Sequence, residues 1–420
     1  MTDTTEETER ALSGEEKRTV ALLGIPTFAL ALAVTVVTTY LPVLAREFVS
    51  STVVIGVIVG LEGIVALWLP LVAGTWSDRL RTPIGGRLPF MLVATPLVVV
   101  ALVGMTLVGS TAAMAAAALV FFVGYYLAYE PYRALYPDAV GDEVAGRAQS
   151  AQALWRGLGT GTALLGGGLL LALWSGAPFV AAAAVYVVAT AVFVLVLRRR
   201  GIPEQPDSDS GGVADAARGL WRLVRDHAEL QAFLVANGLW ELSLAALKTF
   251  VVLYATAGLG YGRATAALII GGVAGVVVVA AVFAGKLADR YGALRVLRIA
   301  LPVHGLGFLV PLLVTEPAII AAAIPFIAVG GGVIMALPYA VLMPLMPADE
   351  HGAVTGYYSF SRGLGTWLGP LMAGAAITAL DGVFSSTDGY QAVWGVCSAA
   401  ILLSLLPLRR LRGAVARSSG

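Results

Sequence analysis

Long apolar segments recur along the whole chain, and only short polar segments separate most of them. Each has roughly twenty or more residues, which as a helix crosses a bilayer core about 30 Å thick. The apolar positions lack strand-like alternation, and a spanning segment must satisfy its own backbone hydrogen bonds, so helices are favoured. The pattern predicts twelve transmembrane helices, at residues 20–45, 52–76, 88–108, 111–136, 147–173, 177–197, 229–257, 264–287, 294–314, 317–346, 352–380 and 389–407.

The composition excludes an ordinary soluble protein. Of the 420 residues, 58% are hydrophobic and 13% are charged, whereas soluble domains are about one quarter charged. The formal net charge of +1 gives no reason to expect a nucleic acid partner. The expected fold class is therefore an all-α integral membrane protein, which crosses the cell membrane many times.

One segment of the chain occurs twice. Residues 131–160 and 338–366 share Pro-Tyr near the start, Asp-Glu in the middle and Arg-Gly-Leu-Gly-Thr at the end. A second match pairs residues 74–79 with 285–290, which share Gly and Asp-Arg. Duplication of this kind predicts two pseudo-symmetric six-helix bundles related by an axis along the membrane normal. The binding site is then expected between them, near the middle of the membrane.

The repeat divides the chain into two bundles joined by its one long polar segment. The expected parts are an N-terminal tail at 1–19, a bundle at 20–197, a linker at 198–228, a bundle at 229–408 and a C-terminal tail at 409–420. In the linker, Arg218, Arg222 and Arg225 share one helical stripe, which fits a short basic helix at an anionic membrane face or a solvated linker helix. Most of the 27 Lys and Arg residues fall on the side of the tails and linker, so both termini are expected in the cytoplasm.

The loop after the second predicted span reads GTWSDRLRTPIGGRLPF at residues 74–90, and a weaker copy, GKLADRYGALR, follows the eighth span at 285–295. This pair resembles the signature loops of the major facilitator superfamily. The resemblance implies that the loops latch the two bundles together on the cytoplasmic side. The expected gating residues are Gly74, Asp78, Arg79, Arg87, Gly285, Asp289 and Arg290.

The longer form of the motif is more particular. SDR…GGRLPF followed by PYRALYPD is similar to the sucrose symporters and other glycoside–pentoside–hexuronide:cation symporters. The matching residues are Ser77, Asp78, Arg79, Gly86, Arg87, Pro89, Phe90, Pro131, Arg133, Ala134, Leu135 and Asp138. The resemblance implies a sugar or glycoside that moves together with a cation, usually a proton.

Six charged residues lie inside predicted spans: Glu62, Glu130, Arg156, Glu241, Lys248 and Arg362. Each would cost roughly 3 kcal/mol or more in lipid, so each should face a cavity or a partner. Proton coupling needs a carboxylate that alternates between a protonated form and a charged form. Burial favours the protonated form, and a nearby guanidinium favours the charged form. Glu130, with Arg133 at i+3, is the first coupling candidate, and Glu241 and Glu62 follow. The alternatives are a fixed Glu130–Arg133 strut between helices and a satisfied interhelical hydrogen bond at Glu241.

Sugar sites stack rings on aromatic side chains and bind hydroxyls with amide and charged groups. The substrate-binding candidates are Tyr129, Gln152, Trp155, Arg156, Asn237, Trp240, Lys248, Tyr358 and Arg362. For the aromatic residues the alternative is packing or an interfacial belt. For Arg156 and Arg362 the alternative is anchoring to backbone carbonyls within their own bundles.

These features predict a monomeric secondary transporter that moves a small organic solute, a sugar or glycoside, by proton-coupled alternating access in the lipid bilayer. One alternative is efflux of drugs or amphipathic metabolites on the same fold, and another is a non-transporting membrane receptor or scaffold. No catalytic constellation, metal-ligand spacing or phosphate-binding loop is found in the sequence. We therefore expect no enzyme activity, no metal and no cofactor.

Overall fold

The computed structural model describes residues 14–139, 145–200, 225, 227–345 and 351–411, and every regular element in these ranges is a helix. The helices of the first half are α1 (Gly14–Ala45), α2 (Thr52–Arg79), α3 (Leu88–Met105), α4 (Thr111–Ala139), α5 (Ala145–Leu173) and α6 (Ala177–Arg200). Those of the second half are α8 (Ala228–Leu253), η2 (Tyr254–Gly258), α9 (Arg263–Tyr291), α10 (Ala293–Gly307), α11 (Leu309–Leu313), α12 (Pro317–Ala336), α13 (Pro338–Leu342), η3 (Met343–Leu345), α14 (His351–Ala379), η4 (Ser385–Thr387) and α15 (Ala392–Arg410).

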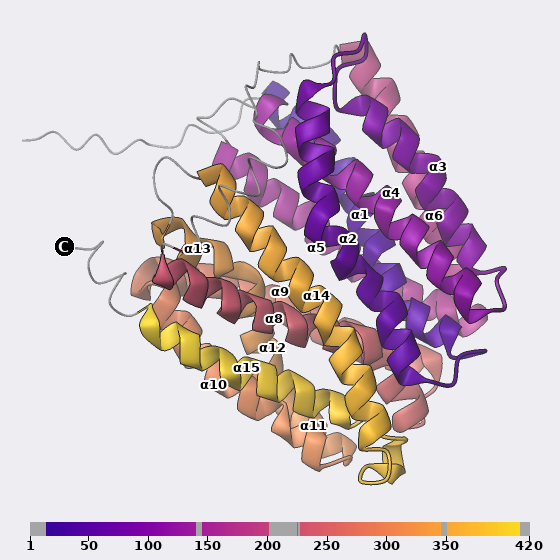
Figure 1. The fold of residues 1–420 in the computed structure, drawn as a ribbon, viewed down its shortest axis with the longest axis vertical. Helices are drawn as coiled ribbons and strands as arrows, with labels where there is room; N and C mark the ends of the chain where they lie inside the picture. Colours follow the sequence, from indigo (N-terminus) through magenta and orange to yellow (C-terminus); the bar gives the residue numbers. More distant parts are fainter. Residues whose placement is uncertain (1–13, 140–144, 201–224, 226, 346–350, 412–420) are drawn as a thin grey trace, which may run out of the picture.

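The two halves form two adjacent groups of helices (Figure 1). Within the first half, α1 packs on α5 and α6, and α3 packs on α4 and α6. Within the second half, α8 packs on α14 and α15, and α12 packs on α9 and α10. The main contacts between the halves are α2 with α14, α5 with α9, and α1 with α8.

The predicted all-α membrane fold is confirmed. Within the described ranges, eleven helices are long and apolar enough to cross a membrane, and α14, which carries Arg362, takes the place of the remaining predicted span. The predicted span 317–346 is not one helix. It breaks at Leu337, because Pro338 lacks a backbone N–H and starts the new helix α13. Most of the predicted linker, including Arg218 and Arg222, lies outside the described residues.

Glycines bring α2 and α14 close together over the first part of α2. A Cβ placed on Gly60 would lie 2.9 Å from the backbone oxygen of Trp367. At Gly56 it would overlap the backbone of Pro370, and at Gly63 it would overlap the backbone of Trp367. Small residues therefore allow the two helix backbones to approach here, as they do in other membrane helix pairs.

Hydrogen bonds also join the halves at this end. The Thr52 hydroxyl lies 2.9 Å from the Gly374 carbonyl oxygen, to which it donates, and 2.9 Å from the Thr378 hydroxyl. In the second contact between the halves, that of α5 with α9, the Arg263 guanidinium at the start of α9 donates to the Leu171 carbonyl oxygen near the end of α5, at 3.3 Å. We call the end of the molecule that holds the start of α2 and the end of α14 the closed end.

The opposite end of the same helices holds the connection from α2 to α3, and we call it the open end. There, an added Cβ at Gly74 of α2 or Gly285 of α9 would meet no heavy atom within 4 Å. The close glycine contacts and hydrogen bonds between the halves described above lie toward the closed end.

Candidate functional site

Four charged side chains meet where α2, α8 and α14 come together. Glu62 comes from α2, Glu241 and Lys248 from α8, and Arg362 from α14, and we call these four residues the central cluster. The part of their cavity that water can enter is about 20 Å³, roughly the size of one water molecule. The rest of the cavity lining consists of Thr38, Val59, Ala245, Thr249, Thr366 and Pro370.

Local sequence explains how these charges meet. Glu241 and Lys248 are seven residues apart on α8, which is about two helical turns and places them on one face. Glu62 precedes Gly63, whose missing side chain allows α2 to contact Gly363 and Trp367 of α14. The glycine contact that joins the two halves therefore also brings Glu62 to the interface, where it is only 8% exposed.

Two of the four charges form an ion pair. Arg362 Nε lies 3.8 Å from Glu241 Oε1, with both residues in the second half of the molecule. Arg362, Lys248 and Glu241 all lie within electrostatic reach of the Glu62 carboxylate. Across the ranges that the structure describes, Lys248 forms no salt bridge. The cavity therefore contains one ion pair and two further charges of opposite sign.

A second polar group lies on the first half, on α4 and α5. Arg133 Nη1 and Glu130 Oε2 are 4.0 Å apart within α4. The Arg156 guanidinium of α5 donates a hydrogen bond to the Tyr129 hydroxyl and lies 5.4 Å from the centre of that ring. Arg156 and Arg362 each interact with a side chain of their own half, the tyrosine hydroxyl for Arg156 and the Glu241 carboxylate for Arg362.

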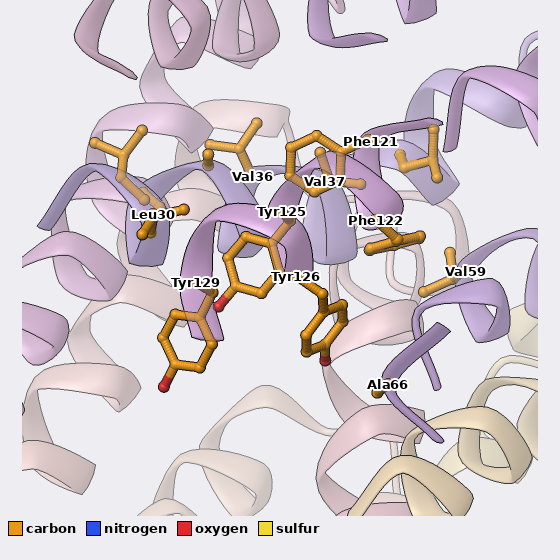
Figure 2. Close-up of a cluster of buried hydrophobic side chains, with 14 of the residues drawn as sticks. Leu30, Val36, Val37, Val59, Ala66, Phe121, Phe122, Tyr125, Tyr126 and Tyr129 are labelled. Atoms are coloured by element: carbon orange, nitrogen blue, oxygen red, sulfur yellow. The ribbon is translucent and has the colours of Figure 1, made fainter. Parts of the chain in front are cut away.

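Three tyrosines of α4, Tyr125, Tyr126 and Tyr129, lie within electrostatic reach of Arg362 of the central cluster. Figure 2 shows Tyr126 and Tyr129 pointing their hydroxyls away from the apolar side chains of the first half. Tyr125 stacks on Tyr129, with ring centres 5.4 Å apart and planes inclined by 11°. Tyr126 lies within electrostatic reach of both Glu62 and Arg362. Tyr125 was not a predicted site residue, although its i, i+4 spacing from Tyr129 places both residues on one helical face.

Several predicted binding residues do not line the central cavity. Trp155 of α5 packs against Gly24 of α1. Gln152 is half-buried, and its Nε2 atom has no hydrogen-bond partner among the described residues. Tyr358 packs edge-on against Tyr339, with ring centres 4.9 Å apart. The sequence locates these residues in the correct helices but does not reveal which side of each helix they occupy.

Asn237 and Trp240 form hydrogen bonds between helices of the second half. Asn237 Nδ2 donates to the Ser361 hydroxyl of α14 at 2.8 Å. Trp240 is fully buried, and its Nε1 donates to the Ser404 hydroxyl of α15 at 2.9 Å. Both side chains therefore hold α8 against its neighbours.

We expect Trp240→Phe to destabilise the protein without changing solute affinity. The substitution removes a buried hydrogen bond and some packing volume, so the free energy of unfolding should fall by about 1–3 kcal/mol. Thermal unfolding in detergent would measure the change, with Trp174→Phe as the control because Trp174 is 50% exposed. A loss of solute affinity in Trp240→Phe at unchanged stability would contradict this structural role.

The predicted gating residues lie at the open end. Asp78, near the end of α2, and Arg87, which precedes α3, form an ion pair at 3.6 Å. Arg79 lies beside Asp78 on the exposed surface. At the end of α9, which carries Gly285, both Asp289 and Arg290 are exposed. The two copies of the loop motif thus occupy corresponding helix ends in the two halves.

Comparison with known proteins gives matches at the level of family and fold. The profile described as the Major Facilitator Superfamily matches residues 23–370 and 240–418. The sequence matches no curated protein. Among solved structures, a bacterial homologue of the human lysosomal transporter Spinster, inward-facing and occupied, has a TM-score of 0.79 at 13% identity, covering 97% of this chain and 98% of its own.

Two further structures share the fold. The nucleoside transporter NupG has a TM-score of 0.74 at 15% identity, covering 94% of this chain and 98% of its own. An auto-inhibited peptide transporter of the POT family has a TM-score of 0.72 at 13% identity, covering 93% of this chain and 96% of its own.

Proposed function

The chain belongs to the Major Facilitator Superfamily, and from the central cluster we infer that this membrane transporter moves a sugar or glycoside into the cell by proton-coupled alternating access. The observation that carries the proposal is the meeting of Glu62, Glu241, Lys248 and Arg362 in one cavity between the halves. Charges in a membrane interior are costly and are usually functional.

The packing of the halves supports alternating access. Transport of this kind requires a closed end that can open and an open end that can close around a site near the middle. The α2–α14 contact closes one end through glycines, and the central cluster lies directly beside it. With both termini in the cytoplasm, as the basic residues predict, the open end faces the cytoplasm.

The geometry favours Glu62 over Glu130 as the proton-binding carboxylate. Glu62 lies in the cavity on the first half, whereas its charged neighbours Glu241, Lys248 and Arg362 all belong to the second half. Rocking of one half against the other therefore changes the charges around Glu62, which is what a proton-coupling carboxylate requires. Glu130 and Arg133 lie on one helix, so rocking of the halves leaves the distance between their backbones unchanged.

The cavity lining suits a polar solute. The residues Thr38, Thr249 and Thr366 stand beside the charged side chains of Glu241 and Arg362. Together they offer both donors and acceptors for sugar hydroxyls. The sugar assignment also draws on the SDR…GGRLPF and PYRALYPD motifs.

A binding screen followed by a transport assay would test the function. The purified protein would be screened by thermal shift against sugars, glycosides and amphiphilic cations at two pH values. We expect stabilisation by a sugar, and alkalinisation of the medium when cells that express the protein receive that sugar. Stabilisation by amphiphilic cations alone, together with greater sensitivity of cells to these cations when the gene is deleted, would instead support efflux. If substitution of the charged residues of the central cluster by neutral ones leaves the protein's function in cells unchanged, that result would support a receptor or scaffold.

Arg362→Ala is expected to weaken binding of the sugar found in that screen by about tenfold or more, because hydrogen bonds to charged groups contribute about 1.5–3 kcal/mol. The concentration dependence of the thermal shift would measure the affinity. Arg409→Ala is the matched control, since Arg409 is exposed at the end of α15. An unchanged affinity in Arg362→Ala would leave the Glu241–Arg362 ion pair a purely structural role.

A further inference from the structure

An apolar groove lies on the second half, between α10 and α12, and encloses about 470 Å³. Its lining includes Val303, Leu306 and Val310 on the α10 side and Ile319, Ala322 and Phe326 on the α12 side. Every residue that lines it is apolar or glycine. α10 lies at the outer edge of the second half (Figure 1), and Leu306 and Phe326 are exposed. Both helices belong to spans that are apolar enough to cross a membrane, so the groove opens onto the hydrocarbon core of the bilayer.

Small side chains leave this space empty of protein. Ala322 and Ala323 of α12 stand between the larger Ile319 and Phe326, and none of these side chains fills the hollow. Empty space forfeits the dispersion contacts of the surrounding atoms, and an apolar wall offers water no hydrogen bond. The tail of a lipid supplies those contacts and needs no hydrogen bond. The groove therefore suits an acyl chain.

The groove continues along one face of α10 toward the open end. Positions on this face recur every three or four residues, at Arg295, Ile299, Val303 and Leu306. Such spacing places them on one side of the helix, and Ile299 is 67% exposed. Arg295 is also exposed and lies about 16 Å from Leu306 along the helix axis. A lipid tail that reaches the middle of a hydrocarbon core about 30 Å thick spans nearly the same depth.

The corner between α9 and α10 presents a net positive charge at the expected headgroup level. Residues 286–298 hold four basic residues and one acidic residue. Lys286, Arg290 and Arg295 are exposed, and the salt bridges among the described residues include none of the three. Arg290 Cζ lies 5.2 Å from the centre of the exposed Tyr291 ring. Exposed aromatic residues of this kind gather where the membrane meets water.

We propose that the groove binds an anionic phospholipid, with one acyl chain between α10 and α12 and the headgroup phosphate at Arg295. A guanidinium can donate two parallel hydrogen bonds to phosphate oxygens. Lys286 and Arg290 add the attraction of two further positive charges, which the ammonium of a zwitterionic choline headgroup would offset. The central cluster is formed by α2, α8 and α14, so the lipid binds apart from the transported solute, whatever that solute is.

Native mass spectrometry of the full chain in detergent, titrated with defined lipids, tests this site. Dioleoyl phosphatidylglycerol is anionic, and dioleoyl phosphatidylcholine has the same tails without net charge. We expect the first phosphatidylglycerol to bind at least tenfold more tightly than phosphatidylcholine, and equal binding would overturn the anionic headgroup. Dihexanoyl phosphatidylglycerol, whose tails are too short to reach the groove, should bind at least tenfold more weakly than the dioleoyl form. Equal binding of the short and long forms would overturn the place given to the tail.

Arg295→Gln tests the headgroup contact. Binding of dioleoyl phosphatidylglycerol should weaken about fivefold or more, the factor that corresponds to about 1 kcal/mol per basic residue, while phosphatidylcholine binding stays the same. Arg409→Gln is the matched control, since Arg409 is an exposed arginine at the end of α15. An unchanged affinity for phosphatidylglycerol in Arg295→Gln would overturn the assignment of Arg295.

Ala322→Phe tests the groove, because a phenyl ring would occupy the space of the acyl chain. Both dioleoyl lipids should bind at least tenfold more weakly. Ala321→Phe is the matched control, since Ala321 is exposed on the same helix but does not line the groove. Size-exclusion chromatography would verify the fold of every variant. Unchanged lipid binding in Ala322→Phe, or a native dimer that Ala322→Phe separates into monomers, would overturn the lipid assignment, and the second result would assign the groove to another copy of the chain.

Discussion

Glu62→Gln is expected to abolish accumulation driven by a pH gradient, by at least a hundredfold, while exchange of labelled for unlabelled solute continues. Glutamine has nearly the shape of a protonated glutamate, so solute binding and rocking of the halves should persist. It cannot release a proton, so the gradient no longer drives the cycle. Proteoliposomes loaded with unlabelled solute would measure exchange, and empty proteoliposomes under a pH gradient would measure accumulation.

Two further substitutions make this result specific. Glu316→Gln, at an exposed position before α12, is the neutral control and should transport like the native protein. Glu130→Gln tests the other coupling candidate, which is paired with Arg133 at 4.0 Å. If Glu130→Gln abolishes accumulation and spares exchange while Glu62→Gln does neither, the coupling carboxylate is Glu130.

Gly63→Val is expected to force the closed end open and to stop transport. The valine side chain would overlap the backbone of Gly363 and Trp367, which, unlike the end of a flexible side chain, cannot move aside. The cost of such overpacking is about 1–3 kcal/mol or more, enough to shift the balance between two conformations of similar free energy. Solute exchange should therefore fall at least tenfold.

Spin labels at Ser50 and Asp381 would follow this opening, since these exposed residues border the start of α2 and lie just beyond the end of α14. The single native cysteine, Cys397, is buried and should not take up label. The distance between the labels should increase in Gly63→Val. Gly275→Val is the control, because an added Cβ at Gly275 meets nothing within 4 Å. An unchanged distance in folded Gly63→Val would contradict the assignment of the closed end.

The transmembrane helices were predictable because length and hydrophobicity alone decide whether a segment can span a bilayer. The duplication was also visible, since residues 131–160 and 338–366 share motifs at corresponding places. The break at Leu337 was missed, although Pro338 marked it. Proline is tolerated inside membrane helices, as at Pro26 and Pro70 here, so its presence does not by itself predict where a span breaks.

The members of the central cluster could be named from the sequence, but their arrangement could not. The cost of burial singled out six charged residues, of which Glu62, Glu241, Lys248 and Arg362 share one cavity and Glu130 and Arg156 do not line it. Their ranking depended on local spacing, which favoured Glu130 because Arg133 lies three residues away. The pairing of Glu241 with Arg362 depends on contact between α8 and α14, which are distant in sequence. The hydrogen bond of Trp240 to Ser404 was hidden for the same reason.

The bonds that join Thr52 to Gly374 and Thr378, and Arg263 to Leu171, have a consequence for energetics. Each of the neutral Thr52 bonds contributes only about 0.5–1.5 kcal/mol net, and the bond from the charged Arg263 about 1.5–3 kcal/mol. Thermal fluctuation can therefore break these hydrogen bonds. A solute whose binding favours the opposite conformation by a comparable free energy is sufficient to reverse the populations of the two conformations. Stronger bonds between the halves would hold the transporter in one conformation. Bonds of this strength allow the bound solute to change which conformation is populated.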